Sequence, residues 1–367
     1  MSDQDLLKIK HECNLRYLLP AIGSLLPWIK SGGSLDDVAT ASINVHAVGI
    51  AFKRVGGRIT DRLCVRVSVL RKMSVEQLAR ANGTLIPREI GGVAIDVVEA
   101  APLSITPLSA SAQRQSSGAS AGDAQAVKKL RPLRAGCSIE FGDVSFGTLG
   151  AFCRSTDPRD RGKVFLLSCR HVLAGFETPL VLEPIFQHGH VSGQGHSGIS
   201  PVAGKAQRMI ESEDPEDSPL RYVADAAIAP LKRGIGFDPD NLGVGVRGGI
   251  LDLLALDAQD ALTSERYCKF GRTTGFTVGT LDTVRQDTKV VFDNEARIFD
   301  DTYVIRRLPD AEKPMSARGD SGAMMFHEAT KKAVGLVIGG PIGQDEGDAT
   351  FVSPLRPILK KLKIELI

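Results

Sequence analysis

The segment 317–326, ARGDSGAMMF, has the residue types of a serine-nucleophile loop, and its centre is Gly319-Asp320-Ser321-Gly322. A serine hydroxyl becomes a nucleophile when a base removes its proton, a carboxylate orients that base, and amide donors stabilise the oxyanion. Gly, Asp and Ser also form ordinary turns. A catalytic role therefore requires that the rest of the chain supply a base and a carboxylate.

His171 is the best candidate for the base, because it follows the apolar segment VFLLSC and a strand end would hold it rigidly. Three other histidines share the Gly-rich segment HGHVSGQGHSG: His188, His190 and His196. Their spacing is also compatible with zinc, but no nearby Cys or carboxylate completes the set. His327 follows Ser321 too closely to be the obvious base.

Asp225 is the candidate for the orienting carboxylate. It opens the apolar run DAAIAPL, where a carboxylate is expected to be buried. Burying a lone charge is costly unless a partner supports it. The alternative interpretation is that Asp225 caps a turn before a strand.

The order His171, Asp225, Ser321 resembles that of the trypsin-like (chymotrypsin-fold) serine peptidases. The resemblance covers about residues 132–367. GDSG is its most specific motif, and SCRHVLAG and DAAIA are looser forms of the family's His and Asp motifs. The segment CKFGRTTGFTVGT is similar to the start of the second barrel in bacterial members. It implies a mainly β fold with two six-stranded antiparallel β-barrels and the site between them.

The resemblance also assigns a role to each of these residues. Ser321 would be the nucleophile, His171 the general base and then general acid, and Asp225 the group that orients His171. The amides of Gly319 and Ser321 would form the oxyanion hole. Cys169 is the alternative nucleophile. It is disfavoured because the loop that would supply the oxyanion amides contains Ser321 and not Cys169.

The same resemblance predicts the specificity pocket. Met315 would form its floor and Ala349 its far wall. A wall strand with an open edge for the substrate backbone would run through Val337, Ile338, Gly339 and Gly340. Because no acid occupies the floor, we expect an apolar P1 residue of modest size, such as Leu, Met or Ala.

Asp320 is expected to point inward and to support the oxyanion loop. By resemblance to bacterial members, Lys269 in CKFGRTTG would be its cationic partner, with Arg272 as the fallback. An internal cation would make a new N-terminus unnecessary, so we expect the uncleaved chain to have a formed oxyanion hole.

The rest of the pattern suggests how the chain is divided. Residues 1–40 form a helical segment, and 41–104 a small α+β domain with a hairpin at Gly56-Gly57 and a helix capped by Ser74. Residues 105–131 are small and polar and predict a flexible linker. From 132 to 367, short strands between Gly-rich turns predict the mainly β domain, closed by an amphipathic helix. The N-terminal half resembles a small domain in bacterial intracellular peptidases related to the plant Nal1-like type.

Composition narrows the function further. The net charge is +2, so the composition shows no excess of basic residues that would indicate binding to nucleic acid or to an anionic membrane. The N-terminus lacks a signal-peptide pattern and the six cysteines form no CxxC pair, so we expect a cytoplasmic protein with buried thiols and without metal or cofactor. Its partners would be a protein or peptide substrate and a regulatory protein. The rival functions are a partner-activated effector, as in bacterial defence, and a non-catalytic binding protein of the same fold.

Overall fold

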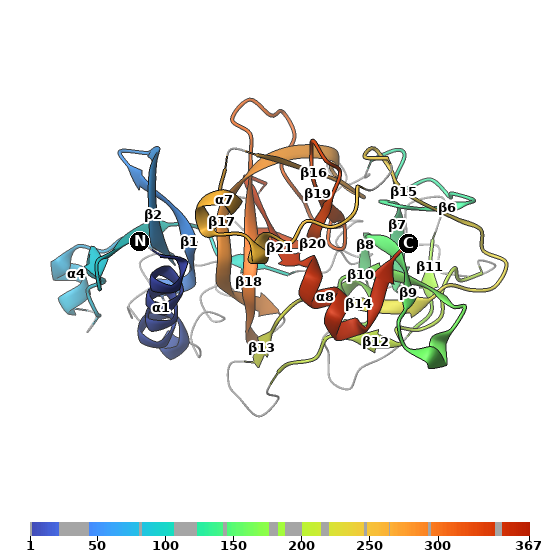
Figure 1. The fold of residues 1–367 in the computed structure, drawn as a ribbon, viewed down its shortest axis with the longest axis horizontal. Coiled ribbons are helices and arrows are strands. Elements are labelled where there is room, and N and C mark those ends of the chain that lie inside the picture. Colours follow the sequence, from blue (N-terminus) through green and yellow to red (C-terminus); the bar gives the residue numbers. More distant parts are fainter. Residues whose placement is uncertain are drawn as a thin grey trace.

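The computed structural model describes residues 2–21, 44–80, 83–105, 123–141, 145–175, 183–187, 200–213, 220–245, 248–263, 265–292, 295–341 and 347–367. The chain is mainly β. In Figure 1 the N-terminal unit (blue and cyan) lies at one end, the C-terminal strands (orange and red) lie in the middle, and the strands of the central part of the chain (green and yellow) lie at the other end.

Six C-terminal strands form a closed ring of antiparallel pairings. They are β16 (Arg266–Gly271), β17 (Gly275–Phe292), β18 (Glu295–Arg307), β19 (Met324–His327), β20 (Ala333–Pro341) and β21 (Ala349–Pro354). The pairing runs β16–β17–β18–β21–β20–β19 and returns from β19 to β16. Alternate side chains of these strands, including Leu281, Ile305 and Val337, enter one buried cluster.

The central part of the chain forms smaller sheets around a second core. One sheet contains β7 (Ser138–Phe141), β8 (Ser145–Thr148) and β11 (Ile185–Phe186); another contains β9 (Ala151–Ser155), β10 (Val164–Ser168), β12 (Arg208–Met209) and β14 (Ala227–Pro230). A parallel pair joins β6 (Leu133–Ala135) to β15 (Phe237–Asn241). Ile139, Phe152 and Leu166 belong to the core that these sheets share.

Helix α8 (Leu355–Leu362) buries its apolar side chains, including Leu355 and Ile358, in a cluster that also contains Phe165 of β10 and Phe326 of β19. The amphipathic closing helix is thereby confirmed. The chain then adds β22 (Ile364–Leu366) to β9, a strand that the sequence did not predict.

The N-terminal unit contains α1 (Asp3–Cys13), a π-helical turn (Asn14–Leu18), a 3-10 turn (Leu19–Ala21), β1 (Val45–Val55), β2 (Arg58–Val69), α4 (Val75–Arg80), β3 (Glu89–Ile90), β4 (Val93–Glu99) and β5 (Leu103–Ser104). The hairpin at Gly56-Gly57 is confirmed, with positive φ at both glycines. The Ser74 cap is confirmed too, since the Gln77 amide donates to Ser74 Oγ at 3.2 Å.

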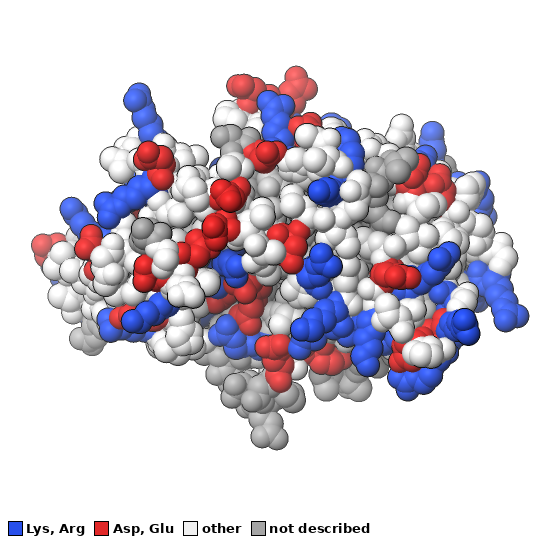
Figure 2. Space-filling model, in the orientation of Figure 1, with Lys and Arg blue, Asp and Glu red and all other residues white. Residues whose placement is uncertain are grey.

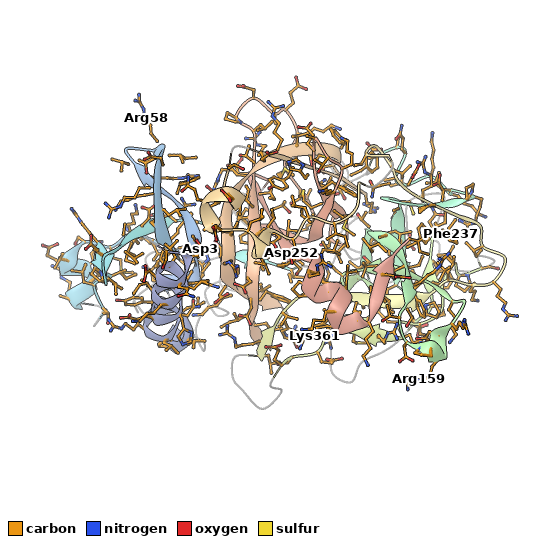
Figure 3. All side chains as sticks on the ribbon, viewed as in Figure 1. Asp3, Arg58, Arg159, Phe237, Asp252 and Lys361 are labelled. Carbon is orange, nitrogen blue, oxygen red and sulfur yellow. The ribbon has the colours of Figure 1, made fainter. Side chains whose placement is uncertain are left out.

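This unit is continuous with the C-terminal strands, because β1 pairs with β17 and extends one sheet across both regions. Lys10 of α1 makes ion pairs of 2.8 Å with Asp287 and with Asp301. The Asp3 carboxylate accepts from the Ala258 amide at 3.0 Å, and Figure 3 labels Asp3 on the side of α1 that faces the orange elements.

The remaining elements are short. They are α6 (Arg170–Leu173), α7 (Ala258–Ala261), β13 (Leu220–Tyr222) and two 3-10 turns (Pro158–Asp160 and Leu253–Ala255). Among the described residues, no helix has the length and apolar character needed to cross a membrane. On the face shown in Figure 2, Lys and Arg side chains alternate with Asp and Glu without forming a continuous basic surface.

Lys289 is a buried charge where β17 meets the N-terminal unit. This fully buried residue of β17 donates from Nζ to the Val45 carbonyl at 3.3 Å, and burial lowers its pKa to about 7. The unfolded chain binds the Lys289 proton more tightly than the folded chain does. Burying the charge therefore lowers the free energy of unfolding most at and below pH 7, and this loss disappears as the pH rises to the unfolded pKa of about 10.4.

Lys289→Met is therefore expected to raise the free energy of unfolding at neutral pH by roughly 2–4 kcal/mol, since one pKa unit corresponds to about 1.4 kcal/mol. Urea unfolding at pH 7 and pH 10 measures the effect. A gain of the same size at both pH values would contradict the buried-charge explanation.

Candidate active site

His171 lies where the sequence placed it, directly beyond the end of β10. Cys169 has extended backbone geometry and begins the short helix α6, which carries His171 into the interior with an exposed fraction of 1%. Because β10 pairs with both β9 and β14, the strand end that precedes His171 is fixed on two sides. The position of the imidazole is thus set by the sheet.

Asp225 lies in the turn between β13 and β14 and is fully buried. Its Oδ2 is hydrogen-bonded to Nδ1 of His171, and its Oδ1 accepts from the His171 amide at 3.2 Å. The Asp225 amide donates to the hydroxyl of Ser353 on β21 at 3.2 Å. The carboxylate thus has the partners that a buried charge requires, and it orients the ring through Nδ1.

Ser321 lies in the tight turn that leads from 317 into β19. The Asp320 amide donates to the Ala317 carbonyl and the Ala323 amide to the Asp320 carbonyl, each at 3.0 Å. The hydroxyl Oγ of Ser321 lies 3.3 Å from the carbonyl oxygen of Ile338 on β20. These backbone bonds leave the Ser321 side chain partly exposed at the turn.

Two contacts bring the histidine and serine segments together. The carbonyl of Val337 accepts from the Gly322 amide at 2.8 Å and from the Cys169 thiol at 3.2 Å. Gly322 follows the serine, and Cys169 precedes the histidine by two residues. A Cβ on Gly322 would lie 2.0 Å from Ser168 Oγ, so only glycine allows this approach.

The geometry of the loop leaves two amides available for an oxyanion. Among the described residues, no hydrogen bond from the amides of Gly319 and Ser321 is present, whereas the amides of Asp320 and Gly322 are bonded within the protein. Gly319 has φ +98°, a region that side chains disfavour, and a Cβ there would lie 2.5 Å from Thr273 Oγ1.

Thr273 orients the peptide group that carries the first of these amides. Its hydroxyl donates to the Arg318 carbonyl at 2.6 Å. The carbonyl and the N–H of one trans peptide point in opposite directions. The Gly319 amide therefore points away from Thr273.

Asp320 points inward and is fully buried, and the structure contains its ion pair with Lys269, with Nζ 3.0 Å from Oδ2. Burial raises the pKa of Asp320, but the Lys269 ammonium and hydrogen bonds from Thr274 and the backbone lower it by more. Full burial lowers the pKa of Lys269, and Asp320 opposes that effect. The carboxylate of Asp320 is consequently ionised.

Arg272, the fallback cation, is used elsewhere. Its Nε donates to Ser138 Oγ at 3.1 Å, and its guanidinium lies 5.4 Å from the ring centroid of Phe146. The Arg272 amide donates to Thr148 Oγ1 at 3.0 Å. Lys269 is thus the residue that neutralises Asp320.

Comparisons with known proteins give limited similarity. No family model and no curated protein matches the chain. Among solved structures, Thermobifida fusca protease A has 16% identity and a TM-score of 0.40, over 64% of this chain and 98% of that one. Cellulomonas bogoriensis chymotrypsin has 17% identity and a TM-score of 0.40, over 64% and 98%. A glutamic acid-specific serine protease has 16% identity and a TM-score of 0.41, over 64% and 100%.

The alternative nucleophile Cys169 is disfavoured by its surroundings. Its thiol is fully buried, and burial together with nearby Asp225 raises its pKa well above the usual value. A protonated thiol is a poor nucleophile. Cys169, His171 and Asp225 also bring ligand atoms within 4.8 Å of one another, but a metal would require the thiolate and would compete with the His171–Asp225 hydrogen bond.

His327, the described histidine that follows the serine turn, is bonded to other partners. His327 is bonded through Nδ1 to Thr330 Oγ1 at 2.8 Å and through Nε2 to Glu265. The three histidines considered for zinc lie outside the described residues: His188, His190 and His196. The chain's six cysteines are free and buried, as the sequence predicted.

The residues expected to form the specificity pocket lie on neighbouring strands and turns. Met315 is fully buried among core side chains that include Leu281 and Ile305. A Cβ on Gly340 would lie 3.3 Å from the Ala349 carbonyl and 3.4 Å from Ser316 Oγ. The space beside Gly340 is therefore narrow.

The prediction of an open edge on this wall strand was wrong. Ile338 is fully buried, and Gly340 and Pro341 pair antiparallel with Ser104 and Leu103 of β5. The residues of β5 are far away in sequence and have no local pattern that predicts this partner.

Sequence reasoning also missed the polar groups that position the serine turn. Thr148 on β8 donates from its amide to the Ser321 carbonyl at 2.8 Å and from Oγ1 to the Gly319 carbonyl at 2.9 Å. Ser168 Oγ donates to the Thr148 carbonyl at 2.7 Å. Thr273 could have been suspected, because it stands in the quoted segment CKFGRTTG; Thr148 and Ser168 have no such signal.

Proposed function

We propose that the chain is a serine endopeptidase that cleaves peptide bonds through Ser321, His171 and Asp225. One observation carries the proposal: His171 is bonded to Asp225, and the Val337 carbonyl joins its segment to the serine turn by accepting from Cys169 and from Gly322. A buried imidazole with its Nδ1 bound to a carboxylate has its Nε2 as the atom that can exchange a proton.

The reaction follows from these positions. Ser321 Oγ attacks the scissile carbonyl while His171 Nε2 takes its proton, and Asp225 stabilises the resulting imidazolium. The amides of Gly319 and Ser321 donate to the oxyanion. His171 then protonates the leaving amine, and water hydrolyses the acyl-enzyme by the same route in reverse.

We further propose that residues 132–367 have the two-barrel chymotrypsin fold. The closed ring of β16 to β21 supports the second barrel, and the sheets around Phe152 and Leu166 support the first. Free cysteines suit a reducing compartment such as the cytoplasm. The partners that we propose are a protein or peptide substrate and a protein that regulates access to the site.

A fluorophosphonate probe tests the nucleophile. The probe is expected to label the wild-type chain on Ser321 and to leave Ser321→Ala unlabelled, as read by peptide mass spectrometry. Ser74→Ala, which removes an exposed serine hydroxyl at the cap of α4 in the N-terminal unit, is the control and is expected to keep the label. A folded wild-type chain without label at Ser321 would instead favour a non-catalytic binding protein or an effector that awaits its partner.

The pocket predicts the P1 residue. Met315 supplies no charge, and the narrow space between Gly340, Ser316 and Ala349 limits size. An unpaired Lys or Arg would be buried at a cost of several kcal/mol. A peptide library is expected to show cleavage after Ala, Leu or Met, and predominant cleavage after Lys or Arg would show that the pocket is wrongly assigned.

A further inference from the structure

Strand β5 pairs with the edge of β20 that we assign to the substrate backbone under the proposed peptidase function. Ser104 pairs antiparallel with Gly340, and Leu103 with Pro341, at the end of β20. The same two residues pair in parallel with Val291 and Val290 of β17. β5 therefore fills the space between two strands whose edges would otherwise be unpaired there.

The acceptor edge leads directly to the nucleophile. Ile338, two residues before Gly340 on β20, has its carbonyl oxygen 3.3 Å from Ser321 Oγ. An antiparallel strand runs opposite to β20, so β5 advances from Pro341 in the direction of Ile338. A substrate strand that reaches Ser321 along this edge needs the hydrogen-bonding groups that β5 uses.

The segment also occupies apolar sites next to that edge. Leu103 and Ile105 are two residues apart, with exposed fractions of 0% and 3%. Both belong to a cluster that contains Ile338, Ala349 and Phe351 from the two strands of the proposed wall. Alternate residues of an extended strand point the same way, so the edge accepts apolar side chains at this spacing.

We propose that residues 103–105 are a tethered competitor of the substrate, and that the site selects extended peptides with apolar side chains two residues apart. This inference rests on the proposed peptidase function. A tethered segment has a high effective concentration, so the full chain cleaves peptides slowly until the segment is displaced. A substrate that carries the same apolar spacing displaces it best.

The test compares peptide hydrolysis by the wild-type chain and by the double variant Leu103→Asp/Ile105→Asp. The variant is expected to have a KM at least tenfold lower with an unchanged kcat. Ile59→Asp, at an exposed position of β2, is the matched control and is expected to keep the wild-type KM. Ser104→Pro removes a backbone donor from β5, which pairs with both β20 and β17, and gives the same expected shift if the double variant does not fold.

A second arm uses the synthetic peptide Ala-Pro-Leu-Ser-Ile, the sequence of residues 101–105. It is expected to inhibit the double variant competitively and the wild type at least tenfold less well, whereas the peptide with both apolar residues changed to Asp does not inhibit. Equal KM values for the wild type and the double variant, together with no inhibition by the peptide, would overturn the proposal that residues 103–105 compete with the substrate. Absent hydrolysis together with absent fluorophosphonate labelling in every variant would overturn the peptidase function itself.

Discussion

Ser321→Ala is expected to lower kcat/KM for peptide hydrolysis by about 10⁴-fold or more, with no change in the melting temperature beyond a few degrees. The substitution removes one partly exposed hydroxyl that bonds to the Ile338 carbonyl, so it leaves no large cavity. Initial rates on a peptide that the wild type cleaves, together with thermal unfolding, measure both quantities.

His171→Ala is expected to have a similar effect on the rate. The variant that lacks both groups should lose little more than either single variant, because the two groups act in one proton transfer. Its stability should fall further than that of Ser321→Ala, since Asp225 would keep a fully buried carboxylate without its ring partner. If Ser321→Ala hydrolyses peptides at a rate near that of the wild type, the proposed mechanism is wrong.

The residues of the candidate site are easier to recognise in the sequence than the arrangement around them. His171, Asp225 and Ser321 stand in short motifs whose local geometry is encoded locally: a strand end, a turn before a strand, and a glycine-rich turn. Lys269 could be assigned to Asp320 because both fall in motif segments, and the structure contains that ion pair.

The features that the sequence did not predict depend on pairing between strands that are far apart in the chain. Alternation of apolar residues predicts that 45–69 forms a hairpin, but it does not specify that β1 pairs with β17 rather than ending the sheet. The same limit applies to β5 and to β22. Within the segment predicted as a linker, residues 123–131 are described and make fixed contacts: Ala126 is fully buried, and the Asp123 amide donates to the Arg272 carbonyl at 2.7 Å. Composition indicated a polar stretch but not these contacts.

Lys269→Met is expected to lower kcat at least tenfold while Ser321 stays in place, and to lower the free energy of unfolding by about 3–5 kcal/mol. The Asp320 carboxylate would lose its only ion-pair partner among the described residues while remaining fully buried. It would still accept from the amides of Thr273, Thr274 and Ala317. We expect those bonds to keep the turn partly formed, so the loss should appear as a weaker oxyanion hole and hence in kcat more than in KM.

Two controls separate this effect from the general cost of changing a buried lysine. Lys289→Met changes another fully buried lysine on the adjoining strand, and it is expected to stabilise the chain at neutral pH and leave kcat unchanged. Asp320→Asn combined with Lys269→Met removes both charges, so its loss of stability should be smaller than the sum of the two single losses. The pKa of Asp320 is lowered in the folded chain, so the stability that its ionisation contributes is present above the unfolded pKa of about 3.9 and is lost as the pH falls below it.

The same variants test whether the full-length chain is catalytically active without prior cleavage. The carboxylate of Asp320 is satisfied by Lys269 and by backbone amides without a new N-terminus, and the Thr273 hydroxyl holds the Arg318 carbonyl by a hydrogen bond. We therefore expect the full-length chain to be labelled by the fluorophosphonate without prior cleavage, with β5 limiting only the access of peptides. If activity depended strictly on cleavage near residues 130–137 and Lys269→Met had no effect on kcat, a new terminus and not Lys269 would support the oxyanion loop.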